Sequence, residues 1–474
     1  YLVLLSEVWR WTGDAELARR FQGPALAALA WIDGYGDRDG DGFVEYERRS
    51  LGLENQSWKD SGDSQRFRDG RYAAPPIAPA EVQGYVYDAK RRLAELARAA
   101  WGAHELADRL DSEAAALEAR FDDAFWVPDR GGYYALALDR DKQRVDALCS
   151  NLGHLLWSGI VPERRVDAIV DHLTRHELWS GWGLRTMSTS DAAYSPLSYH
   201  NGTVWPHDTA LAAWGLARYG HWDAVHRIAA ALLEAARHFE WSLPEVFAGF
   251  DRSETPFPIG YPTAARPQAW AAGTPLLLLR LLLGLEPNTA ERRLGTLAGA
   301  MPPDGVSLSL QGVRGFGRSW DVTSTSSGIG VDEVACLIDF GVATETVLEH
   351  LPYVDALRQA ELAARAPAPV AAALDEPERD EVHPLLRDVS AHEVTHLQCT
   401  PSLASMLADT ACRTADEFFQ LCARALDYCP PVDITSGEYL RALITADRDL
   451  VPDDQWSYRE ALIDAFRKRH IFPE

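Results

Sequence analysis

Residues Ser198–Phe239 have the sequence SYHNGTVWPHDTALAAWGLARYGHWDAVHRIAAALLEAARHF. Apolar residues recur at i, i+3 and i+4 over Trp205–Tyr219 and again over His221–Phe239, which predicts two consecutive amphipathic helices. The residues before them are polar and aromatic, and they predict a loop. This unit, a helical hairpin preceded by an aromatic-rich loop, decides the fold that we predict.

The same helical periodicity recurs along the chain up to residue 286. Long Gly- and Pro-rich segments such as Ser180–Gly202 separate the helices and exceed ordinary connections in a compact domain, which indicates a functional role. Helical hairpins with aromatic-rich loops on one side predict a mainly α protein with an (α/α)6 toroid-type barrel. About nine helices are evident where six hairpins require twelve, so we expect the first barrel helices to precede Tyr1. The other predicted helices are Tyr1–Trp11, Asp14–Tyr35, Pro79–Trp101, Ala103–Phe121, Arg144–Ser158, Pro162–His176 and Pro267–Leu285.

Tryptophan and cysteine divide the chain into two parts of different composition. Fourteen of the 16 tryptophans lie between Trp9 and Trp270, whereas five of the six cysteines lie at or after Cys336. Alternating residues at 305–313 predict a strand, and small polar residues at 323–330 predict a linker. A second linker, rich in Pro and Ala, is expected at 363–378. The predicted parts are a barrel at 1–286, a small β appendage with linker at 287–328, a mixed α/β fragmentary tail at 329–408 and a helical segment at 409–474.

The charge balance narrows the class of partner. The 46 basic and 70 acidic residues give a net charge of −24, which disfavours nucleic acids and anionic membranes and suits a neutral ligand. The longest apolar run, Pro275–Leu285, is interrupted by Arg280 and is shorter than the roughly 20 residues that span a bilayer. The six cysteines form no CxxC pair, which favours reduced thiols and a cytoplasmic location. We expect no cofactor, and the sequence leaves the oligomeric state open.

Two short segments each place a carboxylate beside an aromatic residue. They are NQSWKDSGDS at 55–64 and LPEVF at 243–247. Cleavage of a glycosidic bond needs two carboxyl groups: one protonates the leaving oxygen, and the other activates water or attacks the sugar. We predict that Asp60 is the general acid, because Trp58 can form an apolar wall that raises its pKa, and that Glu245 is the general base. Asp63 is the alternative acid. Capping of a turn by the aspartates, and a solvated loop position for Glu245, are the structural alternatives.

The loop at 198–208 carries the densest group of candidate binding residues. It places two histidines, an amide, two aromatic residues and a carboxylate within eleven residues. These groups suit the recognition of sugar hydroxyls and the stacking of sugar rings. The last two polar residues of the loop can instead cap the following helix. We predict a carbohydrate substrate held by Trp58, Trp182, His200, Asn201, Trp205, His207, Asp208 and Trp270.

Position by position, the two carboxylate segments resemble the acid and base motifs of bacterial amylo-α-1,6-glucosidases, relatives of the glycogen debranching enzymes. The resemblance covers about residues 1–322 and includes GDRDGDGFVEY at 36–46, PIA at 76–78, EVQGY at 81–85 and SNLGHLLW at 150–157. It implies a six-hairpin (α/α)6 barrel and hydrolysis of α-glucosides with inversion, with α-1,6-linked or short α-glucans favoured. It also implies a substrate-binding role for Gln83. The family's N-terminal β-sandwich has no counterpart in the sequence.

Two motifs match metal-binding patterns only in part. Asp37–Gly42 opens like an EF-hand loop, but position 12 is Arg48 where calcium requires a glutamate, so we expect a tight acidic turn. Glu45 could complete a calcium site of another kind. HEVTH at 392–396 matches the HExxH pattern of zinc peptidases, but its surroundings favour a strand and no third ligand is evident. We predict no metal site, and a zinc peptidase is the minor alternative.

The tail after residue 329 resembles pieces of three unrelated proteins. Residues 333–351 resemble the end of a luciferase-like monooxygenase, and 394–403 resemble a segment of nonribosomal peptide synthetase adenylation domains. Residues 409–474 resemble the C-terminal segment of an uncharacterised bacterial protein group. None carries a whole active site, so we expect a chimeric C-terminus that contributes nothing to catalysis. The remaining alternative for the barrel is a carbohydrate-binding relic without catalysis.

Overall fold

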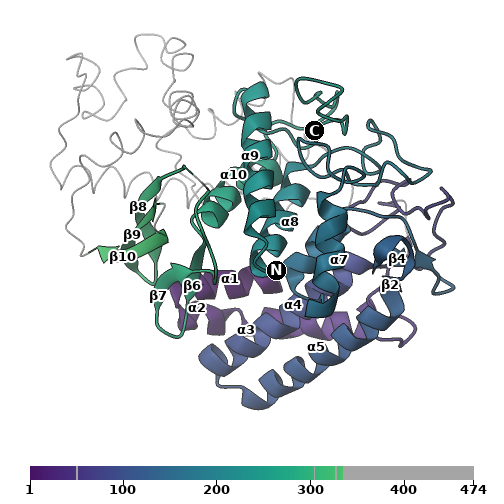
Figure 1. Ribbon diagram of the computed structural model, residues 1–474. Helices are drawn as coiled ribbons and strands as arrows, with labels where there is room; N and C mark the ends of the chain where they lie inside the picture. The colour runs from purple at the N-terminus through teal and green to yellow at the C-terminus, as the bar shows by residue number, and fades with distance from the viewer. Residues whose placement is uncertain (50–51, 304, 326–327, 335–474) are drawn as a thin grey trace, which may run out of the picture. The chain divides into compact units, whose positions relative to one another are not determined.

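The structure is a computed structural model that describes residues 1–49, 52–303, 305–325 and 328–334. All of these residues belong to one compact unit of the chain. The predictions for 335–474, including the HExxH motif, lie outside the described residues. Within the described ranges the fold is mainly α, as predicted (Figure 1). The helices are α1 (Leu2–Thr12), α2 (Ala15–Arg20), α3 (Gln22–Trp31), η1 (Ile32–Gly36), α4 (Ala80–Leu96), η2 (Ala97–Trp101), α5 (His104–Phe125), η3 (Asp129–Gly131), α6 (Asn151–Ser158), α7 (Glu163–Thr174), α8 (Pro206–Arg218), α9 (Trp222–His238) and α10 (Ala269–Leu282).

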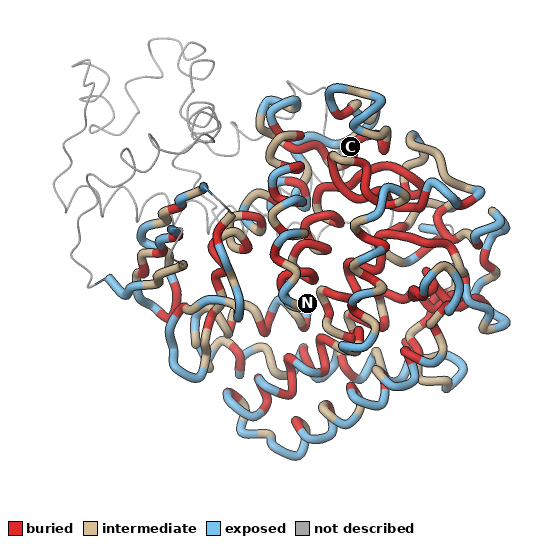
Figure 2. Tube along the Cα trace, in the orientation of Figure 1, coloured by how far each residue is buried: buried red, intermediate tan, exposed pale blue. Residues whose placement is uncertain are grey.

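Alternate helices form a row, and the helices between them cover it. In this row α4 contacts α6, α6 contacts α8 and α8 contacts α10, while α5, α7 and α9 each pack against the preceding member (Figure 1). At the other end of the row, α1 packs against α4. Figure 2 shows buried chain on the facing sides of these helices and exposed chain on their outer sides. Consecutive helical hairpins produce this alternation. No helix in the described ranges is both long and apolar enough to cross a membrane.

The α8–α9 hairpin shows how the sequence dictates this arrangement. Pro206 begins α8, where its fixed φ suits the first turn and its missing N–H costs no helical hydrogen bond. Gly220, in the short connection between the helices, has a φ of 80°, which glycine adopts without strain. On α9, Val225 and Leu232 are completely buried, so one face of the helix joins the core.

The crossing of α6 and α8 depends on small residues. A Cβ atom on Gly153 would lie 2.3 Å from the Cβ of Ala212. A Cβ atom on Gly215 would lie 2.6 Å from the backbone nitrogen of Trp157. The two helices therefore approach to a distance that larger side chains do not allow. This close approach sets the position of the α6 and α8 N-termini, where several candidate site residues lie.

The long loops before α8 and after α9 are tied to one another. Isolated antiparallel bridges join Arg185 to Val204, Val204 to Phe247 and Phe247 to Gly260. Val204 and Phe247 are completely buried. These loops are therefore ordered parts of the fold, and they bring distant sequence segments to one end of the helices.

Short antiparallel strands complete the structure. Residues 285–334 form a hairpin and a separate three-stranded sheet. A buried cluster around Trp320 joins this β region to Trp11 of α1 and Leu279 of α10, so the appendage packs on the helices. The strands are β1 (Ala78–Pro79), β2 (Trp126–Val127), β3 (Tyr133–Tyr134), β4 (Ala137–Leu138), β5 (Arg144–Val145), β6 (Leu285–Asn288), β7 (Arg293–Thr296), β8 (Leu308–Gly315), β9 (Arg318–Thr325) and β10 (Gly328–Val334), in the orders β1-β4-β5, β2-β3, β6-β7 and β8-β9-β10.

Three predicted elements differ from the structure. The linker predicted at 323–330 is wrong: Thr323 pairs with Gly330 where β9 turns back into β10, because the small polar residues form a hairpin. The helix predicted at 144–158 begins only at Asn151, since Arg144–Val145 pair with β4. The helix predicted at 14–35 is divided at Phe21 into α2 and α3. In the two helical cases, strand pairing or a local break overrides the periodicity of the segment.

Candidate active site

Asp60 and Glu245 act on each other electrostatically although they are far apart in the sequence. Asp60 lies in the loop that precedes α4, Glu245 lies in the loop that follows α9, and both are half-buried. Burial raises the pKa of the Asp60 carboxyl group, and the negative charge of Glu245 raises it further against the lowering effect of a backbone hydrogen bond. A raised pKa keeps a carboxyl group protonated closer to neutral pH, which is what a general acid requires.

Two hydrogen bonds fix the Glu245 carboxylate. The Tyr199 hydroxyl donates to Oε1 at 2.9 Å, and the backbone N–H of Ala265 donates to Oε2 at 3.0 Å. The Glu245 N–H also donates to the Ala265 carbonyl at 3.0 Å. Burial and the charge of Glu245 raise the pKa of Tyr199, so its hydroxyl keeps the proton that it donates. These two donors hold the Glu245 carboxylate in one orientation.

Buried neighbours hold the loop that carries Asp60. Asn55 accepts a hydrogen bond from the Tyr46 hydroxyl and donates one to the Ser61 carbonyl, both at 2.7 Å. Lys59 is completely buried, and its ammonium group donates to the carbonyl of Thr186. The residues on both sides of Asp60 are thus bonded to other parts of the fold, which limits the movement of the acid.

Aromatic rings gather beside the two carboxyl groups. The ring centroids of Trp58 and Trp205 are 5.8 Å apart in an edge-to-face arrangement. His207 lies 5.2 Å from Trp58 and 4.3 Å from Trp270 by the same measure, and Tyr199 lies 4.8 Å from Trp205. Trp270, at the beginning of α10, is 49% exposed. An exposed indole face next to polar side chains is suited to stacking on the apolar face of a sugar ring.

The two histidines of this group are uncharged. Burial lowers the pKa of both His200 and His207 to about 3, although the charge of Asp208 acts in the opposite direction. The Nδ1 atom of His200 lies 2.8 Å from the Ser61 hydroxyl, and its buried Nε2 atom has no partner among the described residues. The His200 ring stacks on Trp205 at 4.9 Å. Both imidazoles supply polar groups without adding charge.

A buried polar network supports Trp58 from behind. The His154 ring stacks on Trp58 with centroids 5.4 Å apart and an interplanar angle of 9°. Its Nε2 atom lies 2.8 Å from Asp208 Oδ1, and its Nδ1 atom contacts the Tyr85 hydroxyl. Burial alone would raise the pKa of Asp208, but the hydrogen bond and charge of His154 outweigh it and the pKa is lowered. Asp208 therefore holds His154 in place, and it makes no side-chain cap at the start of α8, where Trp205 is the N-cap residue.

Gln83 and Trp182 do not join this group of side chains. The Gln83 amide accepts the Val44 N–H at 2.9 Å and donates to the carbonyls of Val44 and Pro79 at 2.7 and 3.0 Å. It thereby fastens residues 43–46 to the start of α4. Trp182 is 1% exposed and packs in a hydrophobic cluster with Val204 and Phe247. The surroundings of both side chains are those of structural residues.

Asn201 and Asp63 connect the loops that hold the carboxyl groups. Asn201 is buried and donates to the Asp63 carbonyl at 2.9 Å. The Asp63 carboxylate accepts the Ser61 hydroxyl at 2.8 Å. The Asp63 carboxylate is therefore bonded within its own turn.

Sequence reasoning did not assign roles to Tyr199, Ala265 and His154. Tyr199 stood next to His200 in the loop singled out by its composition, and His154 lay within the SNLGHLLW motif. Both were therefore detectable from their position. Ala265 contributes a backbone N–H, which every residue type except proline supplies. Its role therefore could not be predicted from the sequence.

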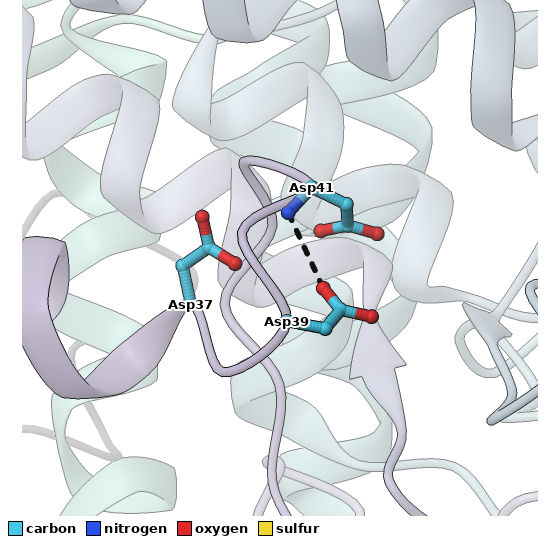
Figure 3. Close-up of side chains that lie close together, drawn as sticks. All are labelled: Asp37, Asp39 and Asp41. Atoms are coloured by element: carbon cyan, nitrogen blue, oxygen red, sulfur yellow. Dashed lines mark hydrogen bonds between the residues drawn. The ribbon is translucent and has the colours of Figure 1, made fainter.

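The acidic turn at residues 37–41 contacts its own backbone and Lys142 rather than the candidate site residues. Figure 3 shows Asp37, Asp39 and Asp41 around one turn of the chain. Asp37 accepts two backbone N–H groups of the same turn at 2.8 and 2.9 Å. The Lys142 ammonium lies 2.6 Å from Asp39, 2.6 Å from Asp41 and 3.1 Å from Glu45. The Lys142 ammonium therefore offsets part of the negative charge of this tight acidic turn.

Comparison with known proteins identifies the family. Residues 3–250, more than half of the chain, match the family described as the mannosylglycerate hydrolase MGH1-like glycoside hydrolase domain. No curated protein matches the sequence. A sialidase structure is similar in fold, with a TM-score of 0.56 and 13% identity over 70% of this chain, which spans 31% of that protein's length.

Two structures from Thermus thermophilus share less of the fold. A GH63 mannosylglycerate hydrolase in complex with Tris has a TM-score of 0.45 and 16% identity, covering 59% of this chain and 76% of that one. An uncharacterized conserved protein has a TM-score of 0.44 and 18% identity, covering 59% and 77%. The family match itself extends over the loop of Asp60, the aromatic loop at 198–208 and Glu245. The chain belongs to the MGH1-like glycoside hydrolase family.

Proposed function

We propose that the chain hydrolyses α-glucosides with inversion, with α-1,6-linked or short α-glucans as the favoured substrates. Asp60 is the proposed general acid and Glu245 the proposed general base. The observation that carries this proposal is the raised pKa of Asp60 beside a Glu245 carboxylate whose two oxygens accept hydrogen bonds from Tyr199 and Ala265. The raised pKa suits Asp60 to the acid role, and the two hydrogen bonds that orient the Glu245 carboxylate suit it to the base role.

In the proposed reaction Asp60 protonates the glycosidic oxygen as the bond to the anomeric carbon breaks. Glu245 removes a proton from water, which attacks the opposite face of that carbon. Room for this water requires the carboxyl groups to be roughly 6.5–9.5 Å apart, whereas retention requires about 5–5.5 Å. Tyr199 acts as a positioning residue, because its hydroxyl orients the base without touching the reacting atoms.

Sugar binding is proposed for the surrounding ring system. Trp58, Trp205 and Trp270 would stack on the sugar, and the imidazoles of His200 and His207 would bind hydroxyl groups. Asn201, Asp208, Gln83 and Trp182 would act by shaping the loops. For the fold we propose that the alternating row of helices is part of an (α/α)6 toroid.

The stereochemistry of hydrolysis tests this proposal directly. Proton NMR recorded during cleavage of an α-glucoside such as isomaltose or a branched maltooligosaccharide should show β-glucose as the first product. Early appearance of α-glucose would refute the inverting assignment. Failure to cleave any glycoside while still binding sugars would instead favour the alternative of a carbohydrate-binding relic.

A second candidate function is hydrolysis of a mannosylglycerate-type glycoside. The description of the matched family favours it. The same acid and base would serve, since the reaction differs in the sugar and the leaving group and not in the bond that is cleaved. Parallel assays with α-glucans and with mannosylglycerate distinguish the two candidates.

A further inference from the structure

Lys59, the residue that precedes the proposed acid, carries a buried positive charge whose bonding partners are neutral. Its side chain is completely buried. The ammonium group donates to the carbonyl of Thr186 and also contacts the Cys149 thiol. Burial raises the pKa of Cys149 to about 11, against the lowering effect of the Lys59 charge, so the thiol is uncharged at neutral pH.

The other buried lysines and arginines that the structure describes form ion pairs. These are Lys90 with Asp33 and Glu113, Arg92 with Glu7 and Asp88, and Arg185 with Asp251. The Lys59 charge acts on the buried Glu81 carboxyl group without forming an ion pair, and burial leaves the pKa of Glu81 raised. A buried charge that lacks an ion-pair partner is costly to the fold. The presence of the Lys59 charge therefore needs a reason other than stability.

The Thr186 carbonyl connects Lys59 to the aromatic loop at 198–208. The Thr186 N–H and hydroxyl groups both donate to the Thr203 carbonyl, at 2.9 and 3.1 Å. Both threonines are completely buried. The Thr203 hydroxyl in turn donates to the Tyr199 carbonyl at 2.6 Å. Lys59 is thus linked through two buried threonines to Tyr199.

Tyr199 extends this path to the proposed base. Its hydroxyl donates to Glu245 Oε1 at 2.9 Å. At the other end of the path, the planar peptide bond between Lys59 and Asp60 makes any displacement of Lys59 displace the backbone of the acid. A continuous series of bonded residues therefore runs from the acid to the base.

We infer that Lys59 is a positioning residue that sets the spacing between Asp60 and Glu245. The inference rests on the proposed hydrolase function and adds to it a residue that does not touch the substrate. The spacing of the two carboxyl groups decides whether a water molecule fits between base and sugar. Small displacements of reacting groups cost much of the rate, which gives a reason for a costly buried ammonium at this position.

Lys59→Met tests the inference on the whole chain, because it removes the ammonium and keeps most of the side-chain volume. We expect kcat for isomaltose to fall by about 10–100-fold. KM should change less than about threefold, since the aromatic rings proposed to bind the sugar are unchanged. For a nitrophenyl α-glucoside, whose leaving group needs little protonation, kcat should fall less than about threefold. No loss, or equal losses on the two substrates, would overturn the inference and leave the hydrolase function intact.

The stability of Lys59→Met should differ little from that of the wild type. The Thr186 carbonyl loses its donor, but the cost of burying an unpaired charge also disappears. The hydrogen bonds of Asn201 with the Asp63 carbonyl and of His200 with Ser61 still join the same loops. We expect Tm to stay within about 2 °C of the wild type. A larger fall in Tm would show that Lys59 holds the fold rather than the acid.

Lys90→Met is the matched control, because it removes a buried ammonium that is paired with two carboxylates. Lys90 lies in α4 and bonds to Asp33 and Glu113, both at 2.8 Å. Its loss should lower Tm by about 1–3 °C and leave kcat for isomaltose within about twofold of the wild type. A fall in kcat as large as that of Lys59→Met would attribute both effects to general destabilisation and overturn the inference.

Thr203→Val breaks the same path at its middle. The Tyr199 carbonyl keeps a donor in this variant, since Trp205 Nε1 also donates to it at 2.9 Å. Because Thr203 is linked to the base, which activates water for every substrate, both glucosides should slow by about 3–10-fold. In the double variant with Lys59→Met, the loss on isomaltose should be smaller than the product of the single losses, because the two residues belong to one path. A loss equal to that product would show independent residues and contradict the inference.

Hydrogen exchange gives a readout that does not depend on turnover. Lys59→Met should speed amide exchange at residues 57–64 and also at 199–205, whereas Lys90→Met should change neither segment. Faster exchange at 57–64 alone would overturn the inference. If the wild type cleaves no glycoside, the proposed hydrolase function fails, while the exchange pattern still decides whether Lys59 links the two loops.

Discussion

At the scale of single residues, the role of Asp60 as general acid can be tested with leaving groups that differ in their need for protonation. Asp60→Asn removes the proton donor, so hydrolysis of unactivated α-glucosides should slow by about 10²–10⁴-fold. An aryl glucoside with an acidic phenol needs little protonation and should lose much less activity. Initial rates on isomaltose and on a nitrophenyl α-glucoside measure the difference. Equal losses on both substrates would exclude Asp60 as the acid.

Although Asp60→Asn should lower activity, it should raise the stability of the folded protein. The pKa of Asp60 is raised in the folded protein, so the unfolded chain releases this proton at a lower pH than the folded protein does. Wild-type stability therefore falls as pH rises between the usual aspartate pKa of about 4 and the raised value. Asparagine avoids this cost, and because Asp60 is partly exposed the gain is small.

Thermal unfolding at several pH values measures this effect. At pH 7 we expect Asp60→Asn to raise Tm by about 1–2 °C. The gain should disappear below about pH 4, where both states of the wild type are protonated. A variant that is less stable than the wild type at every pH would show that the carboxylate is stabilising and that its pKa is not raised.

The residue types in the sequence predicted which chemical groups the site loops contain better than they predicted which of these groups contact one another. The composition of the loops at 55–64 and 198–208 indicated Asp60, Trp58 and the histidines, and the structure brings Trp58 and the histidines together. Gln83 was drawn from a motif, yet its amide bonds to Val44 and Pro79. A sequence states which groups are available, but hydrogen bonds between distant segments decide which of them remain free for a ligand.

At the scale of helices, a glycine-to-alanine substitution should have opposite effects on stability at two positions. One is Gly153, at the α6–α8 crossing, and the other is Gly273, in α10. Gly153→Ala places a methyl group 2.3 Å from the Ala212 Cβ, so the helices must separate and stability should fall by about 1–3 kcal/mol. Gly273, within α10, has no heavy atom within 4 Å of the position that a Cβ would take. Gly273→Ala should therefore stabilise the protein by about 0.5–1 kcal/mol.

Urea unfolding of the two variants measures both effects. Because the side chain introduced is the same, its intrinsic helix propensity contributes equally, and the difference reports the packing at the crossing. Equal effects at the two positions would show that α6 and α8 do not approach as closely as described. A loss of activity in the Gly153 variant is also expected, since this crossing positions His154 and Asp208.

The local apolar pattern predicted where helices form, but it did not predict where each helix begins. The apolar spacing of α4, α5, α7, α8 and α9 is a property of each segment alone, and each lies where the pattern predicts it. The segment at 144–150 also shows helical spacing, but β5 pairs with β4. Strand pairing depends on a partner elsewhere in the chain, so periodicity within one segment cannot anticipate it.

At the scale of the whole molecule, the β region is joined to the helices more firmly than the sequence indicated. The composition of residues 323–330 predicted a linker, and a boundary was expected at 328. In the structure Ile329 and Val331 of β10 pack beside the cluster that contains Trp320 and Leu294. This cluster also contacts Trp11 and Leu279, so the sheet and the first and last described helices share a hydrophobic core.

Truncation at two positions separates the role of the sheet from that of the tail. A chain ending at residue 327 lacks β10 and leaves the edge of β9 unpaired, so it should be less stable and more prone to aggregate than a chain ending at Val334. The chain ending at Val334 keeps every described strand. We expect its Tm and glycosidase activity to equal those of the full chain, because the sequence predicts no complete set of catalytic groups in the segments after it. Differential scanning calorimetry and hydrolysis of isomaltose by the three proteins measure this. A marked loss of activity in the chain ending at Val334 would show that residues 335–474 complete the fold or the active site.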